Sequence, residues 1–199
     1  MAVLRTYPTV RQIGMSEASS VVWHITMSLD GFITGPGDSM EWAFEYPGPH
    51  RIADEVMKST GAILAGRRWY EVATARYGGR GGIYGGAWDG PVFVLTHESP
   101  EAPADEGITF LTSELGDAVA TAKRAAGDGN LEIFGANVAA QCLDAGLLDE
   151  IVVHVAPVLL GDGVRLYGEA VTDHAPIALE RTDVAESGQL TSLRFRVGS

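Results

Sequence analysis

The stretch LEIFGAN, residues 131–137, contains the junction between a predicted strand and a predicted helix. Its first four residues are mostly apolar, as in a buried strand, and the residues after it, VAAQCLDAGLL, have an apolar period typical of a helix. Gly135, Ala136 and Asn137 stand at the junction, and none has a large side chain. Small residues at such a place suit either a plain tight turn or a ligand that lies against the backbone.

The same alternation of strand and helix extends through most of the chain and ends in strands only. Alternation predicts crossover helices and a largely parallel sheet, and the terminal run of strands predicts an antiparallel edge. The predicted strands are 21–27, 61–66, 91–96, 108–111, 131–134, 149–160, 175–183 and 190–197, and the predicted helices are 48–60, 67–75, 114–126 and 136–146.

Length and pattern predict one domain. The chain has 199 residues, 46% of them hydrophobic and 20% charged, which is ordinary for a globular protein. Residues 1–20 contain no long apolar run and are predicted to be a flexible N-terminal extension rather than a secretory signal. Residues 21–199 contain no internal repeat and are predicted to form a single domain.

The net charge of −12 indicates which partners to expect. A strongly acidic protein repels phosphate backbones and anionic lipid, so neither nucleic acid nor a membrane is the expected partner, and a small molecule is. An anionic ligand would need a local group of arginines. The single cysteine, Cys142, allows no intramolecular disulfide and suits a reducing compartment, so we expect a cytoplasmic protein.

A glycine-rich segment, residues 76–90, follows the second predicted helix. The stretch RYGGRGGIYGGAWDGP has seven glycines in sixteen residues, and glycine loses much conformational entropy when it becomes ordered. We therefore predict a mobile loop that becomes ordered when a ligand is bound.

A second strand–helix junction has the sequence Gly66-Arg67-Arg68. The N-terminus of a helix carries partial positive charge, so an exposed arginine there is unfavourable by about 0.3–1 kcal/mol. Either the two guanidinium groups extend into water or they face an anion, with which they can form bidentate bonds. A helix start preceded by glycine is a ready phosphate site.

The two junctions together predict a site for a ligand with several phosphates. The free N–H groups of Ala136, Asn137 and Val138 can hold a pyrophosphate in the same way as the helix start at Arg67. The usual dinucleotide fingerprint G-x-G-x-x-G is absent, as is the P-loop pattern, so an ordinary Rossmann domain is not indicated.

Four stretches carry a resemblance to a known family. They are MSLDGFITG (27–35), ILAGRRWYEV (63–72), VFVLTH (92–97) and EIFGANVAAQCLDAGLLDEIVVHVAPVLLGDG (132–163). With these motifs in this order, about residues 21–197 resemble the dihydrofolate reductase-like superfamily, and most of all the reductase domain of the riboflavin-pathway deaminase–reductase. The last stretch is the most specific of the four.

The resemblance implies a three-layer α/β/α fold with a mixed, mostly parallel central sheet and an antiparallel C-terminal edge. It also implies NADPH as the cofactor, with a phosphate at each of the two helix starts and the adenine ribose over the end of the strand in VFVLTH. The residues implied for cofactor binding are Gly66, Arg67, Arg68, Leu95, Thr96, Phe134, Gly135, Ala136, Asn137 and Val138.

The function implied by the resemblance is hydride transfer from NADPH to a small pyrimidine- or pteridine-like heterocycle, as in the 5-amino-6-(5-phosphoribosylamino)uracil reductase step of riboflavin biosynthesis. Two departures matter. The family usually has Gly-Gly where this chain has Gly135-Ala136, which requires a negative φ at Ala136, and it commonly has Glu where this chain has Phe134. The alternatives are a dihydrofolate or pteridine reductase and a non-catalytic nucleotide-binding protein.

Asp30 is the predicted catalytic residue, because the resemblance places its loop beside the nicotinamide, where it would orient the substrate or relay a proton. The alternative for Asp30 is a turn residue before glycine. Ser28 and Trp42 are the predicted substrate-binding residues, with Trp42 able to stack on a flat ring or to belong to the core. His24 and His154 lie in predicted strands, and no metal-ligand spacing joins the histidines, so no metal site is predicted.

A homodimer is expected from the strand IVVHVAPVLL, residues 151–160. It is very apolar for a sheet face that is open to water, although helices of the same chain can also cover it. The resemblance favours pairing of two copies through the C-terminal strands.

Overall fold

The computed structural model describes residues 19–46, 50–101, 107–168 and 176–198, so most of the predicted extension 1–20 lies outside the described residues. The helices are α1 Arg51–Ser59, α2 Arg67–Arg76, α3 Leu115–Ala126 and α4 Ala136–Asp144, with short 3-10 helices η1 Pro36–Asp38, η2 Glu41–Phe44 and η3 Gly79–Gly86. The strands are β1 Val21–Ser28, β2 Phe32–Thr34, β3 Thr60–Gly66, β4 Val92–Leu95, β5 Ile108–Leu111, β6 Asn130–Phe134, β7 Glu150–Ala156, β8 Val164–Arg165, β9 Leu179–Ser187 and β10 Leu190–Val197.

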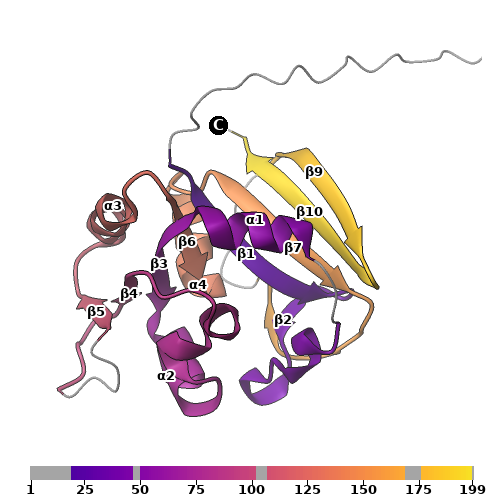
Figure 1. The fold of residues 1–199 in the computed structure, drawn as a ribbon, viewed down its shortest axis with the longest axis horizontal. Helices are drawn as coiled ribbons and strands as arrows, with labels where there is room; N and C mark the ends of the chain where they lie inside the picture. The colour runs from indigo at the N-terminus through magenta and orange to yellow at the C-terminus, as the bar shows by residue number, and fades with distance from the viewer. Residues whose placement is uncertain (1–18, 47–49, 102–106, 169–175, 199) are drawn as a thin grey trace, which may run out of the picture.

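One eight-stranded sheet organises the molecule, with the strand order β5-β4-β3-β6-β1-β7-β10-β9 (Figure 1). The six strands from β5 to β7 are parallel to one another, and β10 and β9 pair antiparallel at one edge. The expected mixed, mostly parallel sheet with an antiparallel C-terminal edge is therefore confirmed. The first strand of the chain, β1, occupies the middle of the sheet between β6 and β7.

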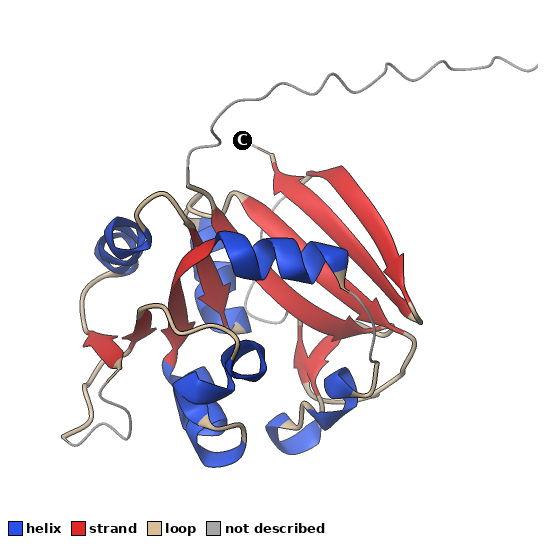
Figure 2. Ribbon diagram, in the orientation of Figure 1, coloured by secondary structure: helices blue, strands red, loops and turns tan. Residues whose placement is uncertain are grey.

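Helices cover both faces of this sheet, as the alternation of side chains along β3 shows. Ala62 and Leu64 point to a core that includes residues of α3 and α4. Ile63 and Ala65 point to the opposite face, where Trp69 of α2 packs. Figure 2 shows α1 lying across that second face. The three-layer α/β/α arrangement expected from the sequence is thus present.

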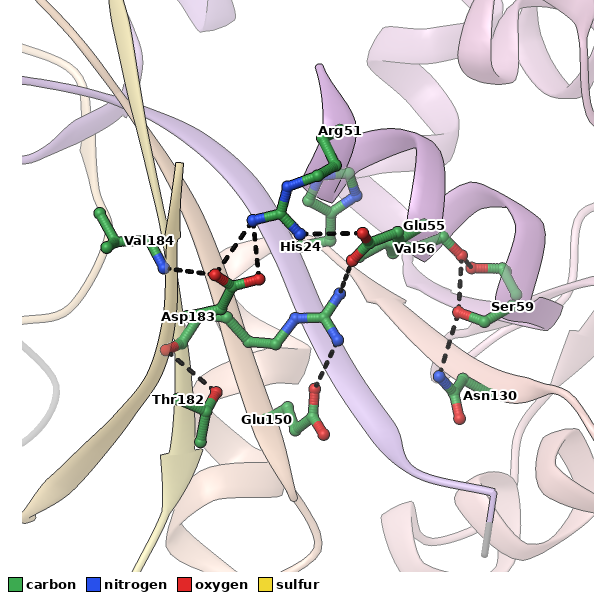
Figure 3. Close-up of polar contacts among 12 residues, drawn as sticks. His24, Arg51, Glu55, Val56, Ser59, Asn130, Glu150, Thr182, Asp183 and Val184 are labelled. Carbon is green, nitrogen blue, oxygen red and sulfur yellow. Dashed lines mark hydrogen bonds and ion pairs between the residues drawn. The ribbon is translucent and has the colours of Figure 1, made fainter. Parts of the chain in front are cut away.

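Helix α1 is held on the sheet by an apolar contact and by a surface ion network. Its Ile52 and Val56 pack on Val22 and Val152. On the outer side, charged side chains join the helix to the antiparallel edge (Figure 3). The pairs in this network are Arg51–Asp183 at 2.9 Å, Arg51–Glu55 at 2.9 Å, Arg194–Glu55 at 3.5 Å and Arg194–Glu150 at 3.9 Å.

Several predicted element bounds differ from the structure. The predicted strand 149–160 ends at Ala156, because Pro157 has no N–H and Val158 N–H turns back to the Ala156 carbonyl at 2.8 Å. The predicted strand 175–183, whose first residue is not described, is β9, Leu179–Ser187. This edge strand is mostly exposed, so no alternation of buried residues defines its bounds. The helix predicted for 48–60 begins at Arg51, and part of its predicted start is not described.

The glycine-rich segment, predicted to be a mobile loop that a ligand orders, contains the 3-10 helix η3. Its aromatic and aliphatic residues hold it against the sheet. Ile83 is buried, and the Trp88 Nε1–H donates to the Thr60 carbonyl at 3.0 Å. The prediction that a ligand orders this segment further remains a prediction. Within the described ranges, no helix is long and apolar enough to cross a membrane.

Candidate active site

A cavity of about 1130 Å³ opens at the carboxyl ends of the parallel strands. Its lining includes the ends of β3, β4 and β6 and the starts of α2 and α4, together with residues of β1 and β7. Ligands of open α/β sheets bind beyond the carboxyl ends of strands, so the cavity has the expected position for a ligand site. Its volume exceeds that of a typical pocket for one small molecule, about 300–1,000 Å³.

The helix-start edge of the cavity, defined here as Gly66 to Arg68 and Gly135 to Val138, consists of two unprotected helix N-termini. Helices α2 and α4 begin after glycine, have no side-chain cap and have no acidic residue in their first turns. By contrast, α1 and α3 carry Asp54 and Asp117 in their first turns. The positive ends of α2 and α4 are therefore left for an external anion.

The two helix starts lie next to each other. A Cβ atom at Gly135 would be 3.9 Å from the backbone nitrogen of Gly66. A Cβ atom at Gly66 would be 3.1 Å from the Val138 side chain, which is closer than most such contacts. Glycine at both junctions thus lets the helices begin side by side, with room for a ligand against the backbone.

The backbone at the LEIFGAN junction explains which of its residues must be small. Gly135 has φ +99° and ψ 134°, a region that residues with a side chain rarely adopt. Among the described residues other than glycine, only Asp38 and Tyr84 have a positive φ. Ala136 therefore has a negative φ as the first residue of α4, which is the condition for alanine in place of the family's second glycine.

The two arginines at the start of α2 are exposed and already paired with acids. The Arg67 Nε–H donates to Glu71 at 2.8 Å within the helix. An Arg68 guanidinium nitrogen lies 2.6 Å from an Asp38 carboxylate oxygen. Exposed pairs of this kind contribute little stability, so a phosphate can replace the carboxylates as the partner of these arginines.

All ten residues predicted to bind the cofactor line this one cavity. Thr96 is buried at the end of β4, and its hydroxyl donates to the Glu98 carbonyl at 2.9 Å. The Phe134 ring packs edge-on against Trp69, with 5.4 Å between ring centroids. The cavity lining contains Gly66, Arg67, Arg68, Leu95, Thr96, Phe134, Gly135, Ala136, Asn137 and Val138.

The structure places Asp30, predicted to be catalytic, outside the residues that line the cavity. Its carboxylate accepts hydrogen bonds from the Ser28 hydroxyl at 2.6 Å and from the N–H groups of Leu160 and Gly161 at 3.1 and 2.8 Å. The Ser28 hydrogen bond, together with these backbone bonds, lowers the pKa of Asp30 to about 2. At neutral pH this carboxyl has no proton to donate, and its contacts join the loop after β1 to the loop after β7.

The two predicted substrate-binding residues also lie outside the cavity lining. Ser28 is fully buried, and its hydroxyl accepts the Phe32 N–H at 2.9 Å while it donates to Asp30. Trp42 is buried against Ala156 and Leu190. These contacts give both side chains structural roles in the position observed here.

A network that sequence analysis missed crosses the sheet beneath the cavity. We call it the buried polar network. From one end to the other, the Thr60 hydroxyl lies 2.9 Å from Glu132, Glu132 lies 3.0 Å from His24 Nδ1, His24 Nε2 lies 2.6 Å from His154 Nε2, and His154 Nδ1 lies 2.6 Å from the Ser192 hydroxyl. The Tyr84 hydroxyl joins it from the glycine-rich segment, 2.7 Å from Glu132 and 2.8 Å from His24 Nδ1.

The register of the sheet brings these residues together. Glu132 pairs with Val22, two residues before His24 on the same face of β1. His154 pairs with Thr26, two residues after His24, and also with Ser192 on β10. The network therefore runs across five adjacent strands, β3, β6, β1, β7 and β10, on the face that α1 covers.

Burial sets the charge states within this network. Burial, together with the nearby His24 and His50, lowers the pKa of His154 to about 3. Burial and the charge of Glu132 raise the pKa of Tyr84 well above its usual range. At neutral pH His154 is therefore a neutral ring with one N–H, and Tyr84 keeps its proton.

The sequence contained a signal for this network, although it was weak. His24, Glu132 and His154 are polar residues with an apolar residue on each side in the sequence. A buried polar side chain needs a hydrogen-bond partner. Once the strand register is known, such residues can therefore be paired with one another. Within the described parts of the chain, no three His, Cys, Asp or Glu side chains are grouped to hold a metal ion.

Comparison with known proteins gives consistent likenesses. The profile described as the RibD C-terminal domain matches residues 87–191, just over half of the chain. YwjB of Bacillus subtilis strain 168, which is described as an uncharacterized protein, is 27% identical over 179 residues, or 87% of this chain and 95% of YwjB.

Solved structures share the fold at lower identity. A protein named for riboflavin biosynthesis from Shewanella sp. PV-4 has a TM-score of 0.74 and 23% identity, over 90% of this chain and 99% of its own. The deaminase/5-amino-6-(5-phosphoribosylamino)uracil reductase of Thermotoga maritima has a TM-score of 0.62 and 16% identity, and the match covers 57% of that chain. A pyrimidine reductase-like protein of Corynebacterium diphtheriae has a TM-score of 0.61 and 15% identity over 92% of its length.

Proposed function

We propose, from the premise that this chain belongs to the RibD C-terminal domain family, that it is an NADPH-dependent reductase of a small pyrimidine- or pteridine-like heterocycle. The observation that carries the proposal is the helix-start edge. Two adjacent glycine-preceded helix N-termini, free of caps and of first-turn acids, suit the phosphates of a dinucleotide.

The residues present fit NADPH in particular. Gly135 leaves its turn open to a pyrophosphate, and Arg67 and Arg68 stand where a 2′-phosphate can replace Glu71 and Asp38 as their partner. When bound, the nicotinamide would supply a hydride. The chain would contribute position, since donor and acceptor carbons must lie about 3–3.5 Å apart.

Phe134 bears on the choice of substrate. It stands where the resemblance leads one to expect a carboxylate, and its ring packs on Trp69 at the cavity wall. An apolar ring there favours a flat substrate that can stack against it, rather than a substrate that needs a charged partner at this point. A dihydrofolate or pteridine substrate is therefore the second candidate, after the uracil substrate of the riboflavin pathway.

The test is consumption of NADPH by the purified protein with each substrate class. We expect NADPH to bind more tightly than NADH, and absorbance of reduced nicotinamide to fall when a phosphoribosylaminouracil or a dihydropteridine is added. Equal affinity for the two dinucleotides would contradict the assignment to NADPH. Tight NADPH binding without turnover of any heterocycle would instead indicate a non-catalytic nucleotide-binding protein.

We also propose that two copies pair through the antiparallel edge. Strand β7 is largely buried within its own chain, so the apolar character of residues 151–160 no longer requires a partner. The proposal rests instead on the edge strand β9, where Leu179 and Val184 are 42% and 50% exposed. Sedimentation at the mass of a single chain would contradict it.

A further inference from the structure

The buried polar network reaches the cavity through four of its members. His24, Tyr84, Glu132 and His154 line the cavity, whereas Thr60 and Ser192 at the two ends of the network do not. Glu132 is fully buried and His154 is 5% exposed. Polar groups so deep in a sheet destabilise the fold unless each is hydrogen-bonded. Apolar residues would fill the same space without needing hydrogen-bond partners. A role at the cavity accounts for their presence.

The two histidines share one hydrogen between their facing nitrogens, because two bare or two protonated Nε2 atoms cannot lie 2.6 Å apart as a hydrogen bond. If His24 donates, neutral His154 carries its own hydrogen on Nδ1 and donates to Ser192. If His154 donates, its Nδ1 accepts the Ser192 hydroxyl hydrogen. A serine hydroxyl can do either, so the network is fully bonded in both directions.

The other end of the network is equally reversible. The Thr60 hydroxyl lies 2.8 Å from the Val56 carbonyl and 2.9 Å from Glu132 Oε2. It has one hydrogen to give. The Thr60 hydrogen can point to Glu132 or to the Val56 carbonyl, so the hydroxyl can donate to the carboxyl group or accept from it. Glu132 therefore keeps a hydrogen-bond partner at Thr60 in either orientation.

Tyr84 is the member that connects the network to a ligand. Its backbone has φ +50° and ψ 35°, a left-handed conformation that is unfavourable by about 1–2 kcal/mol for a residue with a side chain. In this conformation its hydroxyl reaches both Glu132 and His24. Backbone strain that places a hydroxyl on two titratable groups at a cavity wall points to a functional residue.

We propose that the buried polar network supplies the proton that accompanies hydride transfer, with the Tyr84 hydroxyl as the donor and the His24 ring as its source, an inference that rests on the reductase function proposed above. Glu132 and His154 are positioning residues: Glu132 holds the Tyr84 hydroxyl and the His24 ring, and His154 holds the other side of that ring. The Asp30 carboxylate is occupied by its contacts with Ser28, Leu160 and Gly161 and lies outside the residues that line the cavity.

With the cofactor bound, a carbon of a C=N or C=O bond in the substrate would accept a hydride with its electron pair, and the reduced nicotinamide would be oxidised. The nitrogen or oxygen of that bond gains the π electrons and forms a bond to hydrogen as the Tyr84 O–H bond breaks. The His24 Nδ1 proton moves to the Tyr84 oxygen and leaves a neutral imidazole. One proton taken from water restores the imidazolium.

Polar and titratable groups face His24 from several elements. Tyr84 faces it from the glycine-rich segment, Glu132 from β6 and His154 from β7. Behind His154 lie Ser192 on β10 and His50 before α1, whose ring centroid is 6.5 Å from that of His154. The Glu132 carboxyl group lies 3.0 Å from His24 Nδ1, and the neutral His154 ring lies 2.6 Å from His24 Nε2.

The activity test uses two variants and a matched control. Tyr84→Phe keeps the ring beside His24, 5.9 Å between centroids, and removes the hydroxyl. His24→Gln removes the proton source. In both we expect kcat to fall at least about 100-fold, the usual contribution of general acid catalysis, with NADPH affinity unchanged. Trp88→Phe removes a different donor of the same segment and should keep kcat near the wild-type value.

The dependence of kcat on pH distinguishes a network that supplies protons from one that only holds the glycine-rich segment in place. In the wild type, kcat should fall as the pH rises, because the reaction takes up a proton through the network, and His24→Gln should lack this fall. Wild-type rates in Tyr84→Phe and His24→Gln would overturn the proton-supply proposal and leave the reductase function standing.

A second readout needs no cofactor. In protein with isotope-labelled histidine, Ser192→Ala should shift the ring-nitrogen NMR signals and the titration of His24, which Ser192 does not contact. Unchanged His24 signals would overturn the connected network whatever the activity. A wild type that oxidises no NADPH with any heterocycle, yet shows this coupling, would locate the failure in the proposed function.

Discussion

The helix-start edge and the buried polar network belong to one cavity but are built in opposite ways. The edge consists of backbone N–H groups and two exposed arginines, and each half comes from one continuous stretch of sequence. The network consists of side chains from five strands and a 3-10 helix, in contact across separations of up to 130 residues. A backbone site tolerates a change of side chain, such as alanine for glycine at position 136, whereas a side-chain network depends on every member.

The two regions also differ in their exposure to solvent. Arg67 and Arg68 have side chains that are 59% and 70% exposed, so water and salt screen their interactions. The His24 and Glu132 side chains are 10% and 0% exposed, and their interactions are barely screened. Substitutions at the helix-start edge should therefore change ligand affinity. Substitutions in the buried polar network should change the supply of protons to the cavity.

The largest effect is expected at Gly135. In Gly135→Val a β-branched residue is forced to φ +99°, which costs about 1–3 kcal/mol in the fold or shifts the turn that carries the α4 N–H groups. Several charge-assisted bonds to the pyrophosphate are lost together, at about 1.5–3 kcal/mol each, so NADPH affinity should fall at least about 100-fold. Fluorescence titration measures the affinity, and circular dichroism shows whether the protein is folded.

Ala136→Gly is the matched control, because Ala136 already has a negative φ and starts the same helix. It should bind NADPH as the wild type does or slightly better. Folded Gly135→Val with wild-type affinity would show that the junction is only a turn and that the cofactor lies elsewhere.

A smaller effect is expected at the arginines. Arg67→Ala and Arg68→Ala should each weaken NADPH binding about tenfold, the low end of the range for a charge-assisted bond, because both side chains are exposed. Their affinity for NADH, which lacks the 2′-phosphate, should not change. Titration of each variant with both dinucleotides measures this, and an equal loss for NADH would assign the arginines to another part of the ligand.

The smallest effect is expected in stability at mildly acid pH, and it concerns the network. The pKa of His154 is about 3 in the folded protein and about 6.5 when unfolded, so between these values the unfolded chain binds more protons. The free energy of unfolding should therefore be highest above about pH 6.5 and fall as the pH decreases, by at most about 1.4 kcal/mol per pH unit. Urea unfolding at about pH 7 and about pH 6 measures the change.

His154→Gln provides the comparison for this prediction. Glutamine keeps hydrogen-bonding groups between His24 and Ser192 but does not titrate, so the variant should lose less stability on acidification than the wild type. Identical slopes in the two proteins would mean that His154 is charged in the folded state.

The helix-start edge was predictable from sequence because its physics is local. Glycine followed by a helix, with no capping side chain, is visible in LEIFGAN and in the stretch from Gly66 to Arg68 without knowledge of any distant residue. The mostly parallel sheet with its antiparallel edge was predictable for a related reason, since alternating strands and helices followed by strands alone permit few arrangements.

The network was not predictable, because its contacts depend on register. His24 meets Glu132 and His154 only when β1 lies between β6 and β7 at one specific alignment. Asp30 illustrates the reverse problem. An aspartate in a loop near the sheet edge suggests catalysis, but the backbone N–H groups that bind it come from residues 160 and 161, which no local pattern connects to it.

The central position of β1 has a consequence for synthesis of the chain. The strand ends at Ser28, but both of its neighbours are made more than a hundred residues later, and β7 is complete only at Ala156. At about 5–20 residues per second, β1 waits roughly ten seconds on the ribosome with both edges unpaired. An apolar strand in that state can pair with another nascent chain. His24 interrupts the apolar run of VVWHITM, so the residue that later completes the network also makes the waiting strand a poorer partner for aggregation.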